Sequence, residues 1–380
     1  MKKIYIEENL CTVYKLVVHK MQRILFKNGF ALAETPEEAD VLLAGVCAAF
    51  DADEERSVEI VKKLWNVGKP LYTYGCMTQV NPAAFESKHL YASWETDRLI
   101  DVLTQWQVEY VPGPLPTEFR RAEDYRVHNP KKRFIAISTG CSYACSYCPH
   151  KIGAGPLVSI PIESVLAEVQ EAVAAGADTL VLTGIDTACY GSDIGTTFYD
   201  LLYEILRQTK DSIKVHIAQF NPEGLFDDGH YSGRLATLFQ NTRIKDIQIP
   251  IQSASPRILD LMNRFCPIDT FGPLLAQIKQ ANPGVMLRTD IMVGFPCENP
   301  KDLDKTIDFA IKHFSEVAIY KFELKQGTHI ANTGLPQCKD APERLRYAKD
   351  RLRKARLLVH SGGQDVSGLL ENDKIKEANR

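Results

Sequence analysis

The sequence predicts an α/β protein with an N-terminal parallel α/β domain followed by a partial (β/α)6 barrel. Strand and helix patterns alternate along residues 3–75, and the alternation resumes at 133 and continues to 323. Strands separated by helices need crossover connections, which favour parallel sheets. Between the two regions, residues 111–130 are rich in proline and charge, which is typical of a linker. We therefore expect domains at 1–110 and 131–340, with residues 341–380 forming a basic helix and tail.

The expected elements follow from the spacing of apolar residues. In the first region, strands are predicted at 3–8, 41–46 and 70–75, and helices at 12–29 and 53–66. In the second region, the predicted strands are 133–138, 178–183, 213–219, 245–250, 285–293 and 317–323. The helices predicted there are 161–175, 196–209, 255–263, 270–281, 300–313 and the basic helix 342–358. Six strand–helix units are consistent with a barrel or part of one.

Composition narrows the class of protein. The 380 residues carry a net charge of -3, so no overall charge draws the chain to nucleic acid. No apolar run approaches a membrane span, and the start, "MKKIYIEENL", has acidic residues where a secretory signal is apolar. Ten cysteines without an export signal indicate metal binding or catalysis in the cytoplasm rather than a disulfide framework.

Three of these cysteines lie close together in "GCSYACSYCPH", at positions 141, 145 and 148. The loop follows the strand predicted over 134–138, on the functional face of a barrel. Cysteine thiolates hold iron–sulfur clusters, normally four for a [4Fe–4S] cluster. Three thiolates leave one iron open, and an open position admits a substrate or cofactor. A zinc site with His150 as its fourth ligand is the alternative.

The spacing C-x3-C-x-aromatic-C, with Tyr147 as the aromatic residue, resembles the signature of radical S-adenosylmethionine (SAM) enzymes. The resemblance implies that Cys141, Cys145 and Cys148 bind a [4Fe–4S] cluster and that Tyr147 lies near SAM. In these enzymes reductive cleavage of SAM yields a 5′-deoxyadenosyl radical, which abstracts hydrogen from an unactivated carbon.

Cys11, Cys47 and Cys76 are far apart in sequence, but each follows a predicted strand of the first domain. In a parallel sheet these strand ends share one edge, where ligand sites form. We therefore expect the three thiols to meet and hold a second cluster. The alternative is that they are ordinary small buried side chains.

Two open clusters on one chain, with several motifs, resemble the methylthiotransferases, which insert sulfur into C–H bonds of tRNA bases or of a ribosomal protein. The motifs are "ADVLLAGVC", "YGCMTQVNP", "LTGIDTACYG", "IPIQSASPRILDLMNR", "RTDIMVGFPCENPKDLDKT" and "YKFELKQGTHIA". The resemblance implies a TIM-like radical SAM barrel, two [4Fe–4S] clusters, SAM, and a reductant such as flavodoxin or ferredoxin. It also implies that the N-terminal cluster carries or donates the sulfur, with or without methylation of the product.

The same resemblance places Gly184, Gln252, Asp290 and Glu298 near SAM. For Asp290 and Glu298, a structural role in satisfying loop amides is an equal alternative. No catalytic acid or base is assigned. Cys189 and Cys297 lie on predicted active-face loops, but inert packing is the favoured interpretation for both.

The sequence departs from the family where Ala154 and Ile160 replace arginines, where Cys297 replaces a glycine and where Lys325 replaces an arginine. About twenty residues follow the basic helix, too few for the family's RNA-binding barrel. These departures remove phosphate partners, so we expect a peptide or small metabolite as substrate rather than tRNA. The rival functions are tRNA methylthiolation, a radical SAM enzyme whose second cluster donates no sulfur, and a non-enzymatic metal or RNA-binding scaffold.

Overall fold

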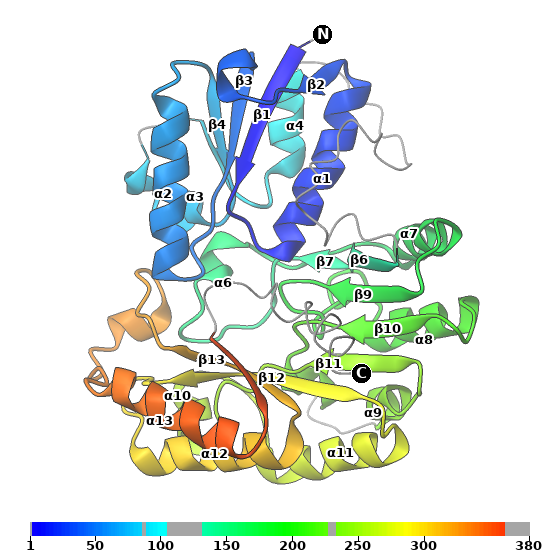
Figure 1. Cartoon of the computed structure of the whole chain (residues 1–380), viewed down its shortest axis with the longest axis vertical. Helices are drawn as coiled ribbons and strands as arrows, with labels where there is room; N and C mark the ends of the chain where they lie inside the picture. Colours follow the sequence, from blue (N-terminus) through cyan, green and yellow to red (C-terminus); the bar gives the residue numbers. More distant parts are fainter. Residues whose placement is uncertain (1, 86–88, 105–130, 227–232, 362–380) are drawn as a thin grey trace. The chain divides into compact units, whose positions relative to one another are not determined.

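The computed structural model describes residues 2–85, 89–104, 131–226 and 233–361 (Figure 1). Contacts between residues divide the chain into two compact units. The first unit comprises residues 1–143, 148–185 and 190–195, and the second comprises 144–147, 186–189 and 196–380. The linker predicted at 111–130 lies outside the described residues, so the domain boundaries stay a prediction.

The first unit contains a five-stranded parallel sheet in the order β2-β1-β3-β4-β5. Its strands are β1 (Lys2–Glu8), β2 (Phe30–Leu32), β3 (Val41–Gly45), β4 (Leu71–Tyr74) and β5 (Leu90–Tyr91). Its helices are α1 (Thr12–Lys27), α2 (Asp51–Trp65), α3 (Met77–Val80) and α4 (Thr96–Thr104). The three strands and two helices predicted here are confirmed. The sequence did not predict β2 and β5, which are too short to show an alternating pattern, or α3 and α4.

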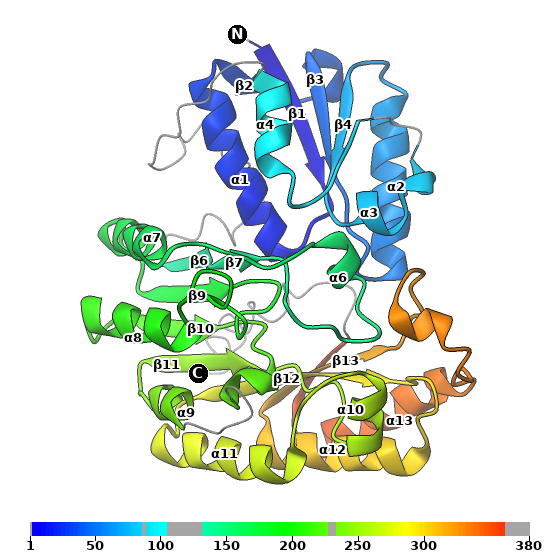
Figure 2. The ribbon, with the colours of Figure 1, turned by 180° about the vertical axis from the view of Figure 1, so that it is seen from behind.

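Alternation along the strands gives this sheet two apolar faces. Ile4 and Ile6 pack into one cluster with Leu25 of α1, whereas Tyr5 joins a second cluster with Ile60 of α2. Successive side chains of a strand point to opposite faces, so a single strand supplies both clusters. Helices α1 and α4 accordingly lie on one side of the sheet and α2 on the other (Figures 1 and 2).

The first unit also holds the strands on either side of the cysteine loop. Strand β6 (Lys132–Ala136) pairs in parallel with β9 (Thr179–Thr183), and α7 (Ile162–Ala174) connects them. The short antiparallel pair β7 (Ser138–Thr139) and β8 (Val158–Ser159) brackets the loop, which contains α6 (His150–Gly153). The loop therefore begins and ends at paired backbone, and its position is fixed at both ends.

In the second unit, consecutive strands are parallel neighbours in the order β14-β13-β12-β11-β10. The strands are β10 (Lys214–Ile217), β11 (Ile244–Gln248), β12 (Met286–Val293), β13 (Glu316–Lys321) and β14 (Leu358–Ser361). The helices are α8 (Phe198–Gln208), α9 (Arg234–Phe239), α10 (Pro256–Leu261), α11 (Ile268–Ala281), α12 (Pro300–His313) and α13 (Ala341–Lys354). In the described parts of both units, 3-10 turns span Pro36–Glu38, Pro82–Ala84, Pro222–Leu225 and His329–Asn332.

Strands β6, β9, β10, β11, β12 and β13 are the six that the alternation predicts, and all are parallel to their described neighbours. The predicted parallel α/β class is therefore confirmed. One expectation was wrong: the basic helix ends at Lys354 rather than at 358, and residues 358–361 form β14 beside β13. Arg356 adopts a φ of 62°, which a helix cannot continue through, so the chain turns there and extends.

Candidate cofactor sites

Three cysteines of the first unit lie just beyond neighbouring strands. Cys11 follows β1, Cys47 follows β3 and Cys76 follows β4, and β1, β3 and β4 are adjacent in the sheet. Burial raises the pKa of Cys76, and charges on Cys11 and on Cys47 raise it further. The pKa of Cys47 is likewise raised by burial and then by charge on Cys11. The structure thus brings the three predicted thiols within electrostatic reach of one another.

Backbone contacts hold these strand ends together. The amide of Cys47 donates a hydrogen bond of 2.9 Å to Oγ of Ser57 on α2, and the Ser57 hydroxyl donates to the carbonyl of Cys47 at 3.1 Å. The side-chain amide of Asn9, which follows β1, donates to the same oxygen at 3.1 Å. At Gly75, φ is 131° and a Cβ would lie 2.3 Å from the carbonyl oxygen of Val46, so only glycine allows this approach.

The donor set suits a positively charged metal group. Burial raises the pKa of Cys11, as it does for Cys47 and Cys76. Cys47 and Cys76 are buried and Cys11 is half-buried. Three such thiols within electrostatic reach of one another resist ionising together in the protein alone, because each thiolate would be desolvated and would repel the others. A bound cluster supplies the missing positive charge and deprotonates its ligands. The three residues therefore fit a [4Fe–4S] cluster with one iron left open.

Helix α6 brings part of the second cysteine triplet to the same place within the first unit. A Cβ on Gly153 would lie 2.6 Å from Cβ of Cys76, and the Ser93 hydroxyl donates to the carbonyl of Gly153 at 2.7 Å. Charge on Cys148 also contributes to the raised pKa of Cys76, after burial, Cys11 and Cys47. The Cys148 thiol is therefore an electrostatic neighbour of the strand-end cysteines.

Cys148 also lies next to His150. Its Sγ is 3.6 Å from Nδ1 of His150, so the fourth ligand of the zinc alternative is adjacent to one thiol. Within the described ranges, no group of three or more His, Cys, Asp or Glu side chains is gathered so as to hold a single metal ion. An iron–sulfur cluster places each thiolate on a different iron and so needs no such gathering.

Cys145 belongs to the second unit, where the end of α10 holds the segment around it. The amide of Ser146 donates to the carbonyl of Met262 at 2.8 Å, and the Ser146 hydroxyl donates to the carbonyl of Leu261 at 2.7 Å. The side-chain amide of Asn263 donates to the carbonyl of Ala144 at 2.8 Å. The motif "LMNR" therefore positions the middle of the cysteine loop through backbone contacts on both sides of Cys145.

Two of the residues expected near SAM lie together in this unit. Gln252 has a φ of 66°, its amide donates to the carbonyl of Asp290 at 2.9 Å, and the Tyr320 hydroxyl donates to its side-chain oxygen. Asp290 is buried in β12 and accepts a hydrogen bond of 3.0 Å from the side-chain amide of Gln248. Burial raises the pKa of Asp290 to about 6. A buried carboxyl with so few partners is suited to a polar ligand.

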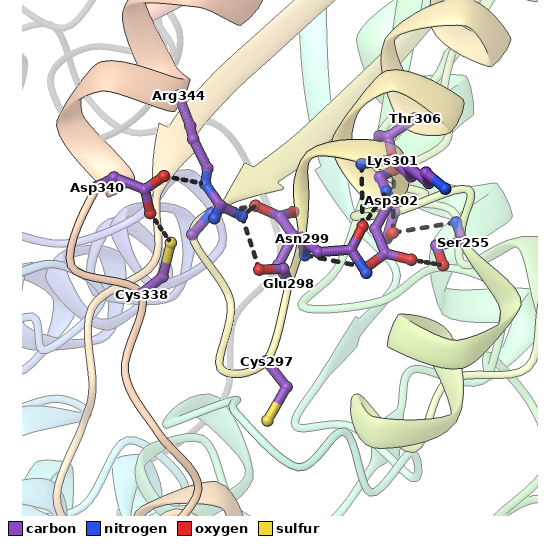
Figure 3. Close-up of polar contacts among 12 residues, drawn as sticks. Ser255, Cys297, Glu298, Asn299, Lys301, Asp302, Thr306, Cys338, Asp340 and Arg344 are labelled. Carbon is purple, nitrogen blue, oxygen red and sulfur yellow. Dashed lines mark hydrogen bonds and ion pairs between the residues drawn. The ribbon is translucent and has the colours of Figure 1, made fainter.

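Glu298 is different, because the protein itself occupies its carboxylate (Figure 3). Oε2 of Glu298 accepts the amide of Gly294 at 2.8 Å and lies 3.5 Å from Nη1 of Arg344 on α13. Arg344 also donates to Asp340, which accepts the thiol of Cys338 at 3.1 Å. Burial raises the pKa of Glu298 to about 7, and the Gly294 amide and Arg344 oppose that shift. These contacts favour the structural alternative for Glu298.

The other predicted residues occupy varied places. Gly184 follows β9 in the first unit. Tyr147 packs edge-on against Phe295 with ring centroids 6.2 Å apart, and both belong to an apolar cluster of the second unit. Cys189 is buried and donates to the carbonyl of Asp186 at 3.3 Å. Cys297 adopts a φ of 64° at a position where the motif has glycine, and its thiol points away from Arg344 (Figure 3).

Sequence reasoning missed two charged residues of the second unit. Nη1 of Arg264 lies 3.5 Å from Sγ of Cys145, and the carboxylate of Asp186 is an electrostatic neighbour of Arg264. Burial raises the pKa of Asp186 to about 7, although charge on Arg264 lowers it. Both residues lie inside quoted motifs, so the signal was present. Their contacts join positions far apart in the chain, which a motif cannot reveal.

Two protein families and several solved structures are similar to this chain. The radical SAM superfamily matches residues 135–310, and the Uncharacterized protein family UPF0004 matches residues 3–94. A radical SAM methyltransferase from Kitasatospora setae, TsrM, superposes with a TM-score of 0.65 at 14% identity, covering 87% of this chain and 77% of that one. The cobalamin-dependent SAM radical enzyme OxsB superposes with a TM-score of 0.58 at 12% identity, covering 100% of this chain and 62% of that one. The chain is a radical SAM enzyme.

Sequence relatives specify the family. A probable threonylcarbamoyladenosine tRNA methylthiotransferase of Methanocaldococcus jannaschii is 28% identical, over 87% of this chain and 78% of its own length. The Pyrococcus horikoshii protein of the same description is 26% identical over 86% and 78%, and the human enzyme is 27% identical over 80% and 54%. The two family models and these relatives together support a radical SAM methylthiotransferase-like family, whose cofactors are SAM and [4Fe–4S] clusters. No helix in the described part of the chain is long and apolar enough to cross a membrane.

Proposed function

We propose that the protein inserts sulfur, with or without methylation, into a carbon–hydrogen bond. Cys141, Cys145 and Cys148 would hold the cluster that binds SAM, and Cys11, Cys47 and Cys76 would hold the sulfur-supplying cluster. The observation that supports the proposal is that three thiols follow adjacent strands within electrostatic reach of one another, with Cys148 as a further electrostatic neighbour. A sulfur donor has to lie near the radical-generating centre, because transfer needs contact between the reacting atoms.

The chain's own residues have identifiable tasks in this reaction. A cluster held by Cys141, Cys145 and Cys148 would supply the radical by reductive cleavage of SAM. Asp290, buried within β12, and Gln252, buried in the segment that bridges to β12, would bind polar groups of SAM. The Glu298–Arg344 contact fixes the loop after β12. The resemblance also implies a reductant of the flavodoxin or ferredoxin class, and open clusters of this kind suit the reducing cytoplasm.

For the substrate, the relatives favour tRNA. Those compared above carry the name threonylcarbamoyladenosine tRNA methylthiotransferase. The expectation of a peptide or small metabolite finds no support in these comparisons. We therefore propose a modified adenosine in tRNA as the substrate.

One set of contacts keeps a peptide or small metabolite as the second candidate. Arg351 of α13 pairs with Asp304 at 2.9 Å and with Asp308 at 2.7 Å, and Arg346 pairs with Glu343 at 3.3 Å. Cations that already have carboxylate partners have less to gain from phosphates. Ala154, at a position where the family has arginine, is buried in the apolar cluster around α1.

The two substrates are separated by one experiment. The reconstituted enzyme is incubated with SAM, a reductant and tRNA, and the nucleosides are analysed by mass spectrometry. A sulfur or methylthio mass added to an adenosine derivative supports tRNA. A binding titration with bulk tRNA across a salt series provides the independent check. Binding weaker than micromolar at physiological salt, with no modified nucleoside, contradicts the tRNA proposal and leaves the peptide or metabolite. 5′-Deoxyadenosine produced without any sulfur-containing product would favour the rival in which the second cluster only relays electrons.

A further inference from the structure

A half-buried cation, Arg264, lies beside one of the three thiols of the radical-generating triplet. After α10, Asn263 adopts a φ of 50° and the amide of Arg264 donates back to the carbonyl of Leu259 at 3.0 Å. Beyond this turn, the guanidinium of Arg264 contacts the cysteine loop. Its Nη1 lies 3.5 Å from Sγ of Cys145, and its Nη2 donates to the carbonyl of Pro250. The Arg264 side chain is therefore anchored at one nitrogen and directed at the Cys145 sulfur with another.

Arg264 is positively charged at every physiological pH, because a guanidinium does not lose its proton in proteins. Asp186 is itself fixed, because its Oδ1 accepts the amides of Ala188 at 2.9 Å and of Asn221 at 3.3 Å. The Cys145 sulfur thus lies beside a permanent positive charge on Arg264. The carboxyl groups of Asp186, Glu223 and Asp290 are further electrostatic neighbours of that charge.

The arrangement has a definite consequence for redox chemistry. Reduction of a [4Fe–4S] cluster adds one electron and therefore one negative charge, while no bond in the protein forms or breaks. Hydrogen bonds to ligand sulfurs, together with net charge around the cluster, set its reduction potential. A cation that donates to a ligand thiolate stabilises the reduced form more than the oxidised form, because the reduced form carries more negative charge.

We propose that Arg264 is a positioning residue for the radical-generating cluster, which raises the reduction potential of that cluster through Cys145, and that the negative charge of Asp186 moderates this effect. The electron comes from an external reductant of the flavodoxin or ferredoxin class. The inference rests on the proposed role of Cys145 as a cluster ligand, and it goes beyond that role by assigning the residue that tunes the ligand.

The test is a redox titration followed by electron paramagnetic resonance. It uses the full chain with Cys11, Cys47 and Cys76 replaced by alanine, so that one cluster remains. Arg264→Gln should make reduction at a fixed potential at least tenfold less favourable, a shift of about 59 mV to more negative potential for one electron. Asp186→Asn should shift the potential in the opposite direction. Arg264→Lys, which keeps the charge without the planar fork, should give an intermediate value.

Controls separate this inference from the assignment on which it rests. Arg351→Gln removes an arginine that pairs with surface carboxylates, and it should leave the potential unchanged. Cys145→Ala should remove the cluster's iron; retained iron would overturn the ligand assignment rather than the tuning. If Arg264→Gln binds no iron, the reduction potential of Arg264→Lys tests the inference instead, and an unshifted potential in that variant would overturn it. If the Arg264 variants keep the reduction potential of the parent protein, the inference is overturned. If they also bind SAM more weakly, Arg264 instead contacts the SAM carboxylate.

Discussion

The backbone amide of Gly294 donates a 2.8 Å hydrogen bond to Oε2 of Glu298, four residues further along the same loop. Arg344 of α13 contacts the same carboxylate and donates to the carbonyl of Glu298 at 2.7 Å. The loop after β12 is therefore closed on itself and tied to a helix by one acidic side chain. This arrangement gives Glu298 a structural role in the second unit, whatever its distance from SAM.

Glu298→Ala should lower the free energy of unfolding by about 1–3 kcal/mol, because the buried Gly294 amide loses its acceptor. Arg344→Ala should have a similar effect, and the double variant should lose less than the sum, since the two residues share one interaction. Chemical unfolding of the four proteins measures this. Glu298→Gln keeps an acceptor and should bind SAM nearly as well as the parent. Abolished SAM binding in Glu298→Gln with unchanged stability would instead make Glu298 a direct SAM ligand.

Gly153 is the point at which α6 approaches Cys76. Gly153→Ala should shift α6 or Cys76, because the added Cβ would lie 2.6 Å from Cβ and 2.9 Å from the carbonyl oxygen of Cys76. Overpacking of this kind costs about 1–3 kcal/mol. We expect less iron after anaerobic reconstitution and a lower unfolding temperature. Gly284→Ala is the matched control, since its nearest neighbour would be 3.8 Å away. Equal iron content in both variants would show that α6 does not constrain Cys76.

Asp290 should make the stability of the cofactor-free protein depend on pH. Its folded-state pKa, raised by burial from 3.8 to about 6, means that the native state holds this proton more tightly than the unfolded state. The contribution of Asp290 to the free energy of unfolding is therefore fully present at low pH and is lost as pH rises from about 4 to 6. Asp290→Asn should recover up to about 3 kcal/mol at pH 8 and progressively less toward pH 4.

Gln248, which donates a hydrogen bond to Asp290, provides a control for this prediction. The side-chain amide of Gln248 lowers the pKa of Asp290, so Gln248→Ala should steepen the loss of stability with pH. Urea unfolding of the three proteins between pH 4 and 8 measures both effects. A constant difference between Asp290→Asn and the parent across this range would show that the carboxyl is not perturbed.

Much of this arrangement is readable from the sequence. Cys11, Cys47 and Cys76 each follow a predicted strand, and the parallel pairing of those strands brings their ends to one edge. Strand–helix alternation is a local signal, so it predicts β12 and α12 to within a residue. Strands β14 and β5 were not predicted, because strands as short as these carry too little periodicity to be recognised in the sequence.

The remaining features depend on tertiary contacts. Arg264 and Cys145 are separated by 119 positions, and nothing in either motif indicates that they touch. Glu298 matched a motif, which predicted proximity to SAM, but the partner that occupies its carboxylate lies on a helix 46 residues away. The preference for a peptide over tRNA was drawn from missing arginines, and the relatives favour the opposite interpretation.

The central claim is that one cysteine triplet holds the cluster that cleaves SAM and the other holds the cluster that supplies sulfur. One set of variants tests it. Anaerobic reconstitution of the parent should give about eight iron atoms per chain. Replacing Cys11, Cys47 and Cys76 by alanine should leave about four, preserve 5′-deoxyadenosine formation and abolish sulfur transfer. Replacing Cys141, Cys145 and Cys148 should abolish both reactions. Sulfur transfer that persists without Cys11, Cys47 and Cys76, or one tightly bound zinc in place of iron, would contradict the account.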